Sequence, residues 1–177
     1  MRLKKLLAAL FAAMFLMSGA PSALAANVSN DDVGEYMITL TKYIEVDEST
    51  GTAKFDTETA KADGLSEESI QIGQEVNRIY SPENAIATRL AFAFHGNWCG
   101  PGHSGPGAPV DNLDELCKRH DECYARTEQH KCDVELMHQL KINFKKFSLT
   151  NKARALAMTA VFASKYGAEE LARWFKK

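Results

Sequence analysis

The sequence predicts a mainly α-helical fold whose N-terminal segment can hold one small β-hairpin. Apolar residues recur at helical spacing in several segments, and capping residues stand directly before those segments. Alternation typical of strands is confined to one short region. A chain of 177 residues is long enough for one hydrophobic core with a small appended module.

The first 25 residues are typical of an export signal. A short basic region, 1–5, precedes an uncharged apolar run, 6–17, and residues 23–25 (Ala-Leu-Ala) form a small-x-small cleavage pattern. The apolar run is shorter than the roughly 20 residues that cross a membrane as a helix. We therefore expect cleavage after Ala25 and a secreted protein, periplasmic if the source is Gram-negative.

Charge is distributed unevenly along the chain. Cleavage after Ala25 removes three bases and no acid, which leaves 18 Lys and Arg against 23 Asp and Glu. Residues 26–98 carry 13 acids and 5 bases, whereas residues 99–177 carry 10 acids and 13 bases. A basic C-terminal part suits an anionic membrane surface, although a solvated helix face explains it equally well. Nothing in the sequence indicates nucleic acid, and we expect a monomer.

Residues 26–80 form an acidic segment in which we find no catalytic chemistry. Alternating residues in 36–46, a turn over 47–51 and a returning strand over 52–55 predict a hairpin, but a helix over 31–43 competes for the same residues. Ser66 caps a further helix that runs to about residue 79. A propeptide, a cover over the site contributed by the same chain, and a binding module remain alternative roles.

Helical patterns continue over the rest of the chain. Ser81 and Pro82 begin a helix that runs to about residue 94. The region 81–150 also contains a helix capped by Asp111 or Asn112 and ending near 127, and another over 133–147. A C-terminal amphipathic helix is predicted over 151–177, in which Trp174 is either an interfacial anchor or part of the terminal packing.

A glycine-rich loop lies between two of these helices. Five glycines fall within residues 96–107. Glycine lets a backbone turn sharply and approach a ligand closely, and calcium prefers six to eight oxygen ligands that often include main-chain carbonyls. The loop lacks the Gly-Lys-Ser/Thr ending of a phosphate-binding loop.

The helix that follows carries the chemistry. His120 is a natural general base near neutral pH, and Asp121 leaves the helix about 100° away from it, which suits a base and a metal ligand side by side. The spacing Cys117-x-x-His120-x-x-Cys123 also suggests zinc, but export favours disulfides. Four cysteines allow three pairings, and spacing alone does not choose among them.

Two motifs, one in the glycine-rich loop and one in the helix that follows it, resemble those of the secreted phospholipase A2 family. They are Trp98-Cys99-Gly100-Pro101-Gly102 and Cys117-Lys118-Arg119-His120-Asp121-Glu122-Cys123-Tyr124, joined by Ala108-Pro109-Val110-Asp111-Asn112-Leu113-Asp114. The resemblance covers about residues 86–147. It implies a core of two antiparallel, disulfide-linked helices and the calcium-dependent hydrolysis of the sn-2 ester of glycerophospholipids at a membrane surface.

The resemblance also implies a role for individual residues. His120 would be the base that activates water, and Asp133 would orient it with help from Tyr124. Asp121 and the carbonyls of Trp98, Gly100 and Gly102 would bind Ca²⁺, and the Gly100 N–H would help to stabilise the oxyanion. Cys99 would pair with Cys117, and Cys123 with Cys132.

The chain also departs from vertebrate members of that family. It has fewer cysteines, no evident β-wing, and no evident second tyrosine beside Asp133, so it resembles a minimal, bacterial type of member. Two alternatives to an enzyme remain: a non-catalytic membrane-active or receptor-binding protein on the same scaffold, and a calcium-binding module without a substrate.

Overall fold

The computed structural model describes residues 30–84, 95–100 and 103–176. Within these ranges the fold is mainly helical, with one two-stranded antiparallel sheet, as the sequence predicts. The expected export signal, the greater part of the helix predicted over 82–94, and Gly102 lie outside the described residues.

The N-terminal segment contains both of the structures that competed in the sequence. Helix α1 (Asn30–Thr41) ends before strand β1 (Ile44–Asp47), which pairs with β2 (Thr52–Phe55). The turn between the strands is stabilised by the Asp47 carboxylate, which accepts the N–H of Ser49 at 2.9 Å. The predicted hairpin is confirmed, with its second strand at residues 52–55 as predicted, but residues 36–41 of the predicted first strand belong to the competing helix α1.

Two further helices follow the hairpin, and the second of them packs on it. Helix α2 (Thr57–Ala62) is short, and α3 (Glu67–Ile79) has the predicted cap, since the Ser66 side chain accepts the N–H of Ser69. The Asn77 side chain binds the main chain of Phe55 on both sides, accepting its N–H at 2.7 Å and donating to its carbonyl at 3.0 Å. This pair of hydrogen bonds joins α3 to the edge of the hairpin.

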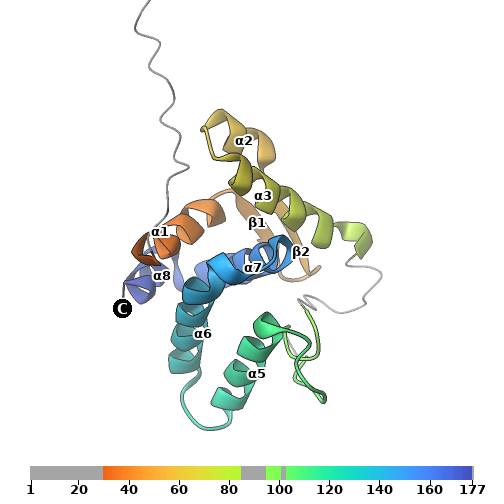
Figure 1. The fold of residues 1–177 in the computed structure, drawn as a ribbon, viewed down its shortest axis with the longest axis vertical. Helices are drawn as coiled ribbons and strands as arrows, with labels where there is room; N and C mark the ends of the chain where they lie inside the picture. The colour runs from red at the N-terminus through yellow and green to blue at the C-terminus, as the bar shows by residue number, and fades with distance from the viewer. Residues whose placement is uncertain (1–29, 85–94, 101–102, 177) are drawn as a thin grey trace, which may run out of the picture.

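Helices α5 (Asn112–Tyr124) and α6 (Gln129–Asn143) form the predicted antiparallel pair (Figure 1). Asp111 is the N-cap of α5, and its side chain accepts two main-chain N–H groups at 3.0 Å. Helix α6 begins four residues earlier than predicted, so Asp133 lies in its second turn.

The prediction of one C-terminal helix over 151–177 is wrong. After the short 3₁₀ helix η1 (Phe144–Lys146), the chain forms α7 (Leu149–Tyr166) and then α8 (Ala168–Phe175). Gly167 separates them with a φ of 87°, a conformation that glycine adopts without a steric cost. Because α8 turns back onto the core, Trp174 is only 1% exposed and belongs to the terminal packing.

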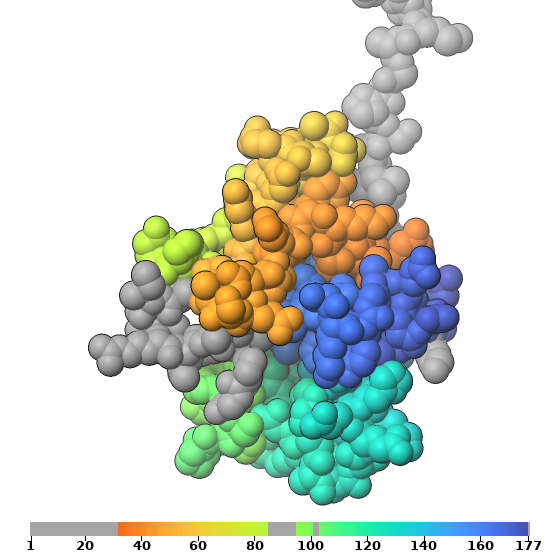
Figure 2. All heavy atoms as spheres, turned by 180° about the vertical axis from the view of Figure 1, so that it is seen from behind, coloured from red at the N-terminus to blue at the C-terminus, as the bar shows by residue number. Residues whose placement is uncertain are grey.

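Helix α7 is the centre of the molecule. It packs against α1, α3, α8 and β1, and its buried face joins one continuous core that includes Leu40, Phe55 and Leu156. The helices α2 and α3 and the α5–α6 pair lie at opposite ends of the molecule (Figure 2), while α1 also contacts α6. None of the described helices is long and apolar enough to cross a membrane.

Two disulfides connect the elements around the α5–α6 pair. Cys99–Cys117 joins the glycine-rich loop to α5, and Cys123–Cys132 joins the end of α5 to the start of α6, with sequence separations of 18 and 9. These are the pairings that the family resemblance implies, and they are confirmed.

Removing Cys99–Cys117, the disulfide that closes the larger loop, is expected to lower the free energy of unfolding by about 3 kcal/mol. The reason is that the unfolded chain then gains the conformational freedom of that loop. A Cys99→Ala/Cys117→Ala double variant, compared with Cys123→Ala/Cys132→Ala in urea denaturation followed by circular dichroism, measures this. We expect the second variant to lose slightly less. An unchanged free energy of unfolding in both variants would contradict the prediction.

Candidate functional site

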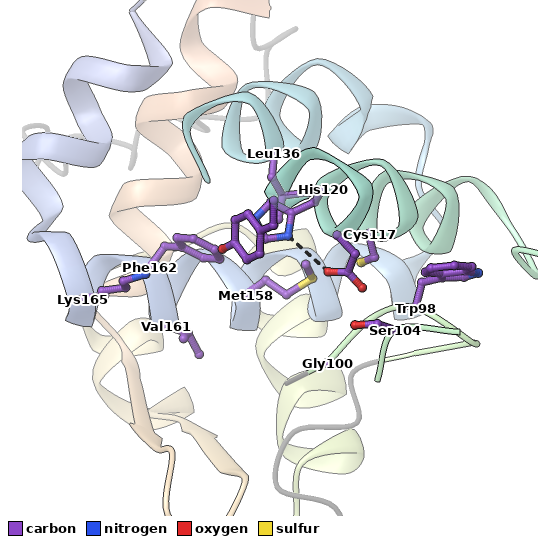
Figure 3. A pocket seen from close by; sticks show the side chains of 12 residues that line it. Trp98, Gly100, Ser104, Cys117, His120, Leu136, Met158, Val161, Phe162 and Lys165 are labelled. Carbon is purple, nitrogen blue, oxygen red and sulfur yellow. Dashed lines mark ion pairs between the residues drawn. The ribbon is translucent and has the colours of Figure 1, made fainter. Parts of the chain in front are cut away.

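A pocket of about 390 Å³ opens between α5, α6, α7 and the glycine-rich loop. In Figure 3 the imidazole of His120 lies at the centre of its wall, with Phe162 and Lys165 on one side and Trp98 and Gly100 on the other. No described residue of the segment 30–80 contributes to this wall, so a covering role for that segment stays a prediction. The lining residues are Trp98, Gly100, Ser104, Cys117, His120, Asp121, Tyr124, Leu136, Met158, Val161, Phe162 and Lys165.

His120 and Asp133 form a hydrogen-bonded pair between the two antiparallel helices. The imidazole Nε2 lies 2.8 Å from the Asp133 Oδ1. The disulfide Cys123–Cys132 ties the end of α5 to the residue directly before Asp133, which explains why two residues on different helices meet. The carboxylate therefore favours the tautomer in which Nε2 carries the hydrogen and Nδ1 is free to accept a proton.

The carboxylate of Asp133 is completely buried and receives four donors. Besides His120, Tyr124 donates to Oδ1, and Tyr166 and Lys165 donate to Oδ2 at 2.5 and 3.2 Å. Burial alone would raise the pKa of Asp133, but the hydrogen bonds from these four side chains outweigh it and hold the pKa well below its usual range. Asp133 is therefore ionised at neutral pH, with its charge directly behind the imidazole.

Tyr166 and Lys165 are the functional residues that sequence reasoning missed. Both come from α7, more than 30 residues after Asp133. The sequence shows Tyr166 only as one member of the apolar stripe of a C-terminal helix, and no local motif connects it to Asp133. Tyr124, by contrast, lies one turn after His120 and is found where the resemblance places it.

The ring of His120 is held in place by its neighbours. Its centroid lies 4.4 Å from that of Tyr124 and 6.3 Å from that of Phe162. Its Nδ1 lies 3.7 Å from the Asp121 Oδ1, too far for a hydrogen bond but close enough for an electrostatic effect. Burial lowers the pKa of His120, but the carboxylates of Asp121 and Asp133 more than offset this, and the net pKa is raised.

Asp121 has the features of a cation ligand. Its Oδ2 is buried and has no hydrogen-bond partner among the described residues, although a buried carboxylate oxygen normally has one. Trp98 and Gly100 line the same pocket, and Cys99–Cys117 ties their loop to α5 one turn before Asp121. The Gly100 carbonyl accepts the N–H of His103 at 3.0 Å and keeps a second lone pair.

The donor set fits calcium better than zinc. Where the structure describes the chain, no three His, Cys, Asp or Glu side chains gather as a metal cluster. A site made from one carboxylate and main-chain carbonyls does not need such a cluster of side chains. Carboxylate and carbonyl oxygens are the ligands that hard cations prefer. Cys117 and Cys123, which suggested zinc in the sequence, are both in disulfides and are not available as ligands.

The fold and the site together define a disulfide-linked helical protein with a His–Asp pair beside a candidate cation site. Residues 74–163 match the sequence model of the family described as phospholipase A2. The chain belongs to the phospholipase A2 family.

Two curated relatives come from the snake Oxyuranus scutellatus scutellatus. The chain is 58% identical to the acidic phospholipase A2 homolog taipoxin gamma chain over 36 residues, 20% of this chain and 22% of that protein. It is 51% identical to the neutral phospholipase A2 homolog taipoxin beta chain 2 over 53 residues, 28% of this chain and 43% of that protein. The chain thus spans less than half the length of either relative. No solved structure is a significant match.

Proposed function

We propose that the protein is a secreted, calcium-dependent phospholipase A2 that hydrolyses the sn-2 ester of glycerophospholipids to a fatty acid and a lysophospholipid. One observation carries the proposal: Nδ1 of His120, whose other nitrogen is bound to Asp133, and the unpartnered oxygen of Asp121 belong to one pocket. The sn-2 specificity comes from membership of the family.

The residues of the pocket divide the proposed reaction between them. His120 Nδ1 takes a proton from a water molecule as the water oxygen attacks the ester carbonyl, and Asp133 stabilises the imidazolium that forms. A Ca²⁺ ion held by Asp121 and the loop carbonyls would polarise the carbonyl and stabilise the oxyanion. The tetrahedral intermediate then collapses, and His120 returns the proton to the leaving alkoxide of the lysophospholipid.

The pocket wall also suits an acyl chain. Leu136, Met158, Val161 and Phe162 are apolar residues that line the same pocket as His120. Apolar walls around a few converging polar groups are typical of small-molecule sites. We propose that these side chains contact the fatty acyl chain and that the protein acts as a monomer bound peripherally to a phospholipid surface.

A non-catalytic, membrane-active role on the same scaffold is the second candidate, because both relatives carry the word homolog in their names. The preserved His120, Asp121 and Asp133 favour an enzyme. Release of vesicle contents by a protein that produces no fatty acid would favour the second role.

Chelation of calcium is expected to abolish hydrolysis without unfolding the protein. The protein without residues 1–25 is added to phosphatidylcholine and phosphatidylglycerol vesicles in 1 mM Ca²⁺ or in excess EGTA, roughly the conditions in which a calcium site would be full or empty. Products are identified by mass spectrometry, and the fold is checked by circular dichroism. Full activity in EGTA would refute the calcium mechanism, and products without a free sn-2 fatty acid would refute the specificity.

A further inference from the structure

A completely buried carboxylate, that of Asp114, lies against the glycine-rich loop. It does not line the pocket. It accepts three main-chain N–H groups: those of Asn97 at 3.0 Å, Trp98 at 2.8 Å and Val110 at 3.0 Å. A fully buried Asp is rare unless its charge is compensated. Here the three donors are main-chain amides of the loop and of the segment that returns from it.

Gly96 allows the loop to approach this carboxylate. A Cβ atom at position 96 would lie 2.3 Å from both Cγ and Oδ2 of Asp114, which no real structure tolerates. The residue also has a φ of 60°, which an L side chain rarely adopts. The close packing of the loop on Asp114 therefore requires glycine at this position, independently of any ligand.

The hydrogen bonds of Asp114 fix the peptide planes next to the candidate ligands. In a trans peptide the N–H and the C=O point in opposite directions, so an anchored N–H also sets the direction of the carbonyl in the same plane. Asp114 anchors the N–H of Asn97 and Trp98, and the N–H of Cys99 binds the His95 carbonyl at 3.1 Å. The peptide that contains the Trp98 carbonyl is thus held through its own N–H, that of Cys99, and the two peptides before it are held by Asp114.

We propose that Asp114 is a positioning residue that sets the cation affinity of the glycine-rich loop by holding its main-chain amides, without itself contacting the cation. The inference rests on the calcium site of the proposed function. It assigns to Asp114 a role distinct from that of Asp121: Asp121 supplies an oxygen to the site, and Asp114 holds the peptides that lead into the Trp98 carbonyl.

Calcium affinity measured by isothermal titration calorimetry tests the proposal without using activity. Asp114→Asn keeps the shape of the side chain but replaces one acceptor by an NH₂ group that faces main-chain donors. We expect its dissociation constant for Ca²⁺ to rise at least about tenfold, the usual effect of removing a group that orients metal ligands. Titrations are made well below the melting temperature of each variant.

Two neighbouring carboxylates provide matched controls. Glu115→Gln removes a charge one residue away, on a side chain that accepts from Arg119 at 2.8 Å. Asp111→Asn weakens the N-cap of α5 and the hydrogen bonds of the Asp111 side chain with His95 and Asn151. This variant therefore lowers stability, but it removes no acceptor from the amides of residues 97 and 98. Both controls are expected to bind Ca²⁺ within about twofold of the wild type, since neither holds a loop amide next to a ligand.

Wild-type affinity in Asp114→Asn would overturn the proposal, while calcium binding by the wild type would still support the proposed function. If the wild type itself binds no Ca²⁺, both fail. If Asp114→Asn does not fold, Val110→Pro replaces it, because it removes one N–H donor and changes a side chain that is 58% exposed. We then expect affinity to fall at least about threefold, the loss of one hydrogen bond to a charged group, and unchanged affinity overturns the proposal.

Discussion

Replacing His120 by Gln is expected to lower kcat for vesicle hydrolysis at least about a hundredfold, because a general base contributes roughly that much or more. The amide of Gln does not accept a proton at neutral pH. It can still donate a hydrogen bond toward the buried carboxylate of Asp133, so the variant is expected to keep its fold. Calcium affinity should be unchanged, since Asp121 and the loop are untouched.

The measurement needs a second histidine as a control. His138 lies on α6 and does not line the pocket, so His138→Gln should retain wild-type kcat. Both variants are compared for initial rate, melting temperature and Ca²⁺ affinity. Hydrolysis by His120→Gln within a few-fold of the wild type would mean that another group is the base, and the proposed reaction would fail.

The local part of the site is readable from the sequence because it is contiguous. His120, Asp121 and Tyr124 lie within two turns of one helix, and their relative directions follow from helix geometry. The predicted Asp111 cap and the turn after β1 are also short-range effects that depend on a few neighbouring residues. Such features do not depend on how the rest of the chain is arranged.

The part of the site that the sequence does not show, Lys165 and Tyr166, depends on where α7 lies relative to the α5–α6 pair. Tyr166 reaches Asp133 because the end of α7, which packs on α1, α3 and β1, also lies beside the pocket that α5 and α6 line. The apolar spacing of residues 152–177 predicts a helix but not which neighbours it meets, and a single glycine, Gly167, decides where that helix ends. Long-range packing of this kind has no local signature, which is why Lys165 and Tyr166 were missed.

The same packing connects the N-terminal segment with the site through α7. Helices α1 and α3 pack against α7, whose residues Val161, Phe162 and Lys165 line the pocket. The segment thus supports the helix that supplies two of the four donors to Asp133. Its connection with the proposed catalysis is indirect and runs through the position of α7.

Replacing Asp133 by Asn is expected to lower kcat at least about tenfold, because the neutral amide neither stabilises the imidazolium nor enforces one tautomer of His120. The variant should also lose stability at neutral pH. The buried carboxylate accepts from two tyrosines, a lysine and the imidazole, whereas the NH₂ group of Asn faces at least one of these donors.

The pH dependence of this stability difference distinguishes a charge effect from simple misfit. The pKa of Asp133 is lowered in the folded state, whereas an unfolded Asp has a pKa of about 3.9. The stabilisation by the carboxylate is therefore fully present above about pH 4 and is lost as the pH falls toward the folded-state pKa. Asn does not titrate, so the difference in unfolding free energy between wild type and Asp133→Asn should narrow below about pH 4.

Urea denaturation at pH 7, 4 and 3 measures this difference, with Tyr166→Phe as the matched control. That variant removes one donor to Oδ2 but keeps the charge, so it should retain most of the wild-type acid sensitivity. A difference between wild type and Asp133→Asn that is the same at all three pH values would mean that the folded-state pKa is not lowered. The buried anion behind His120 would then have no role as a charge, and its contribution to the site would be one of shape alone.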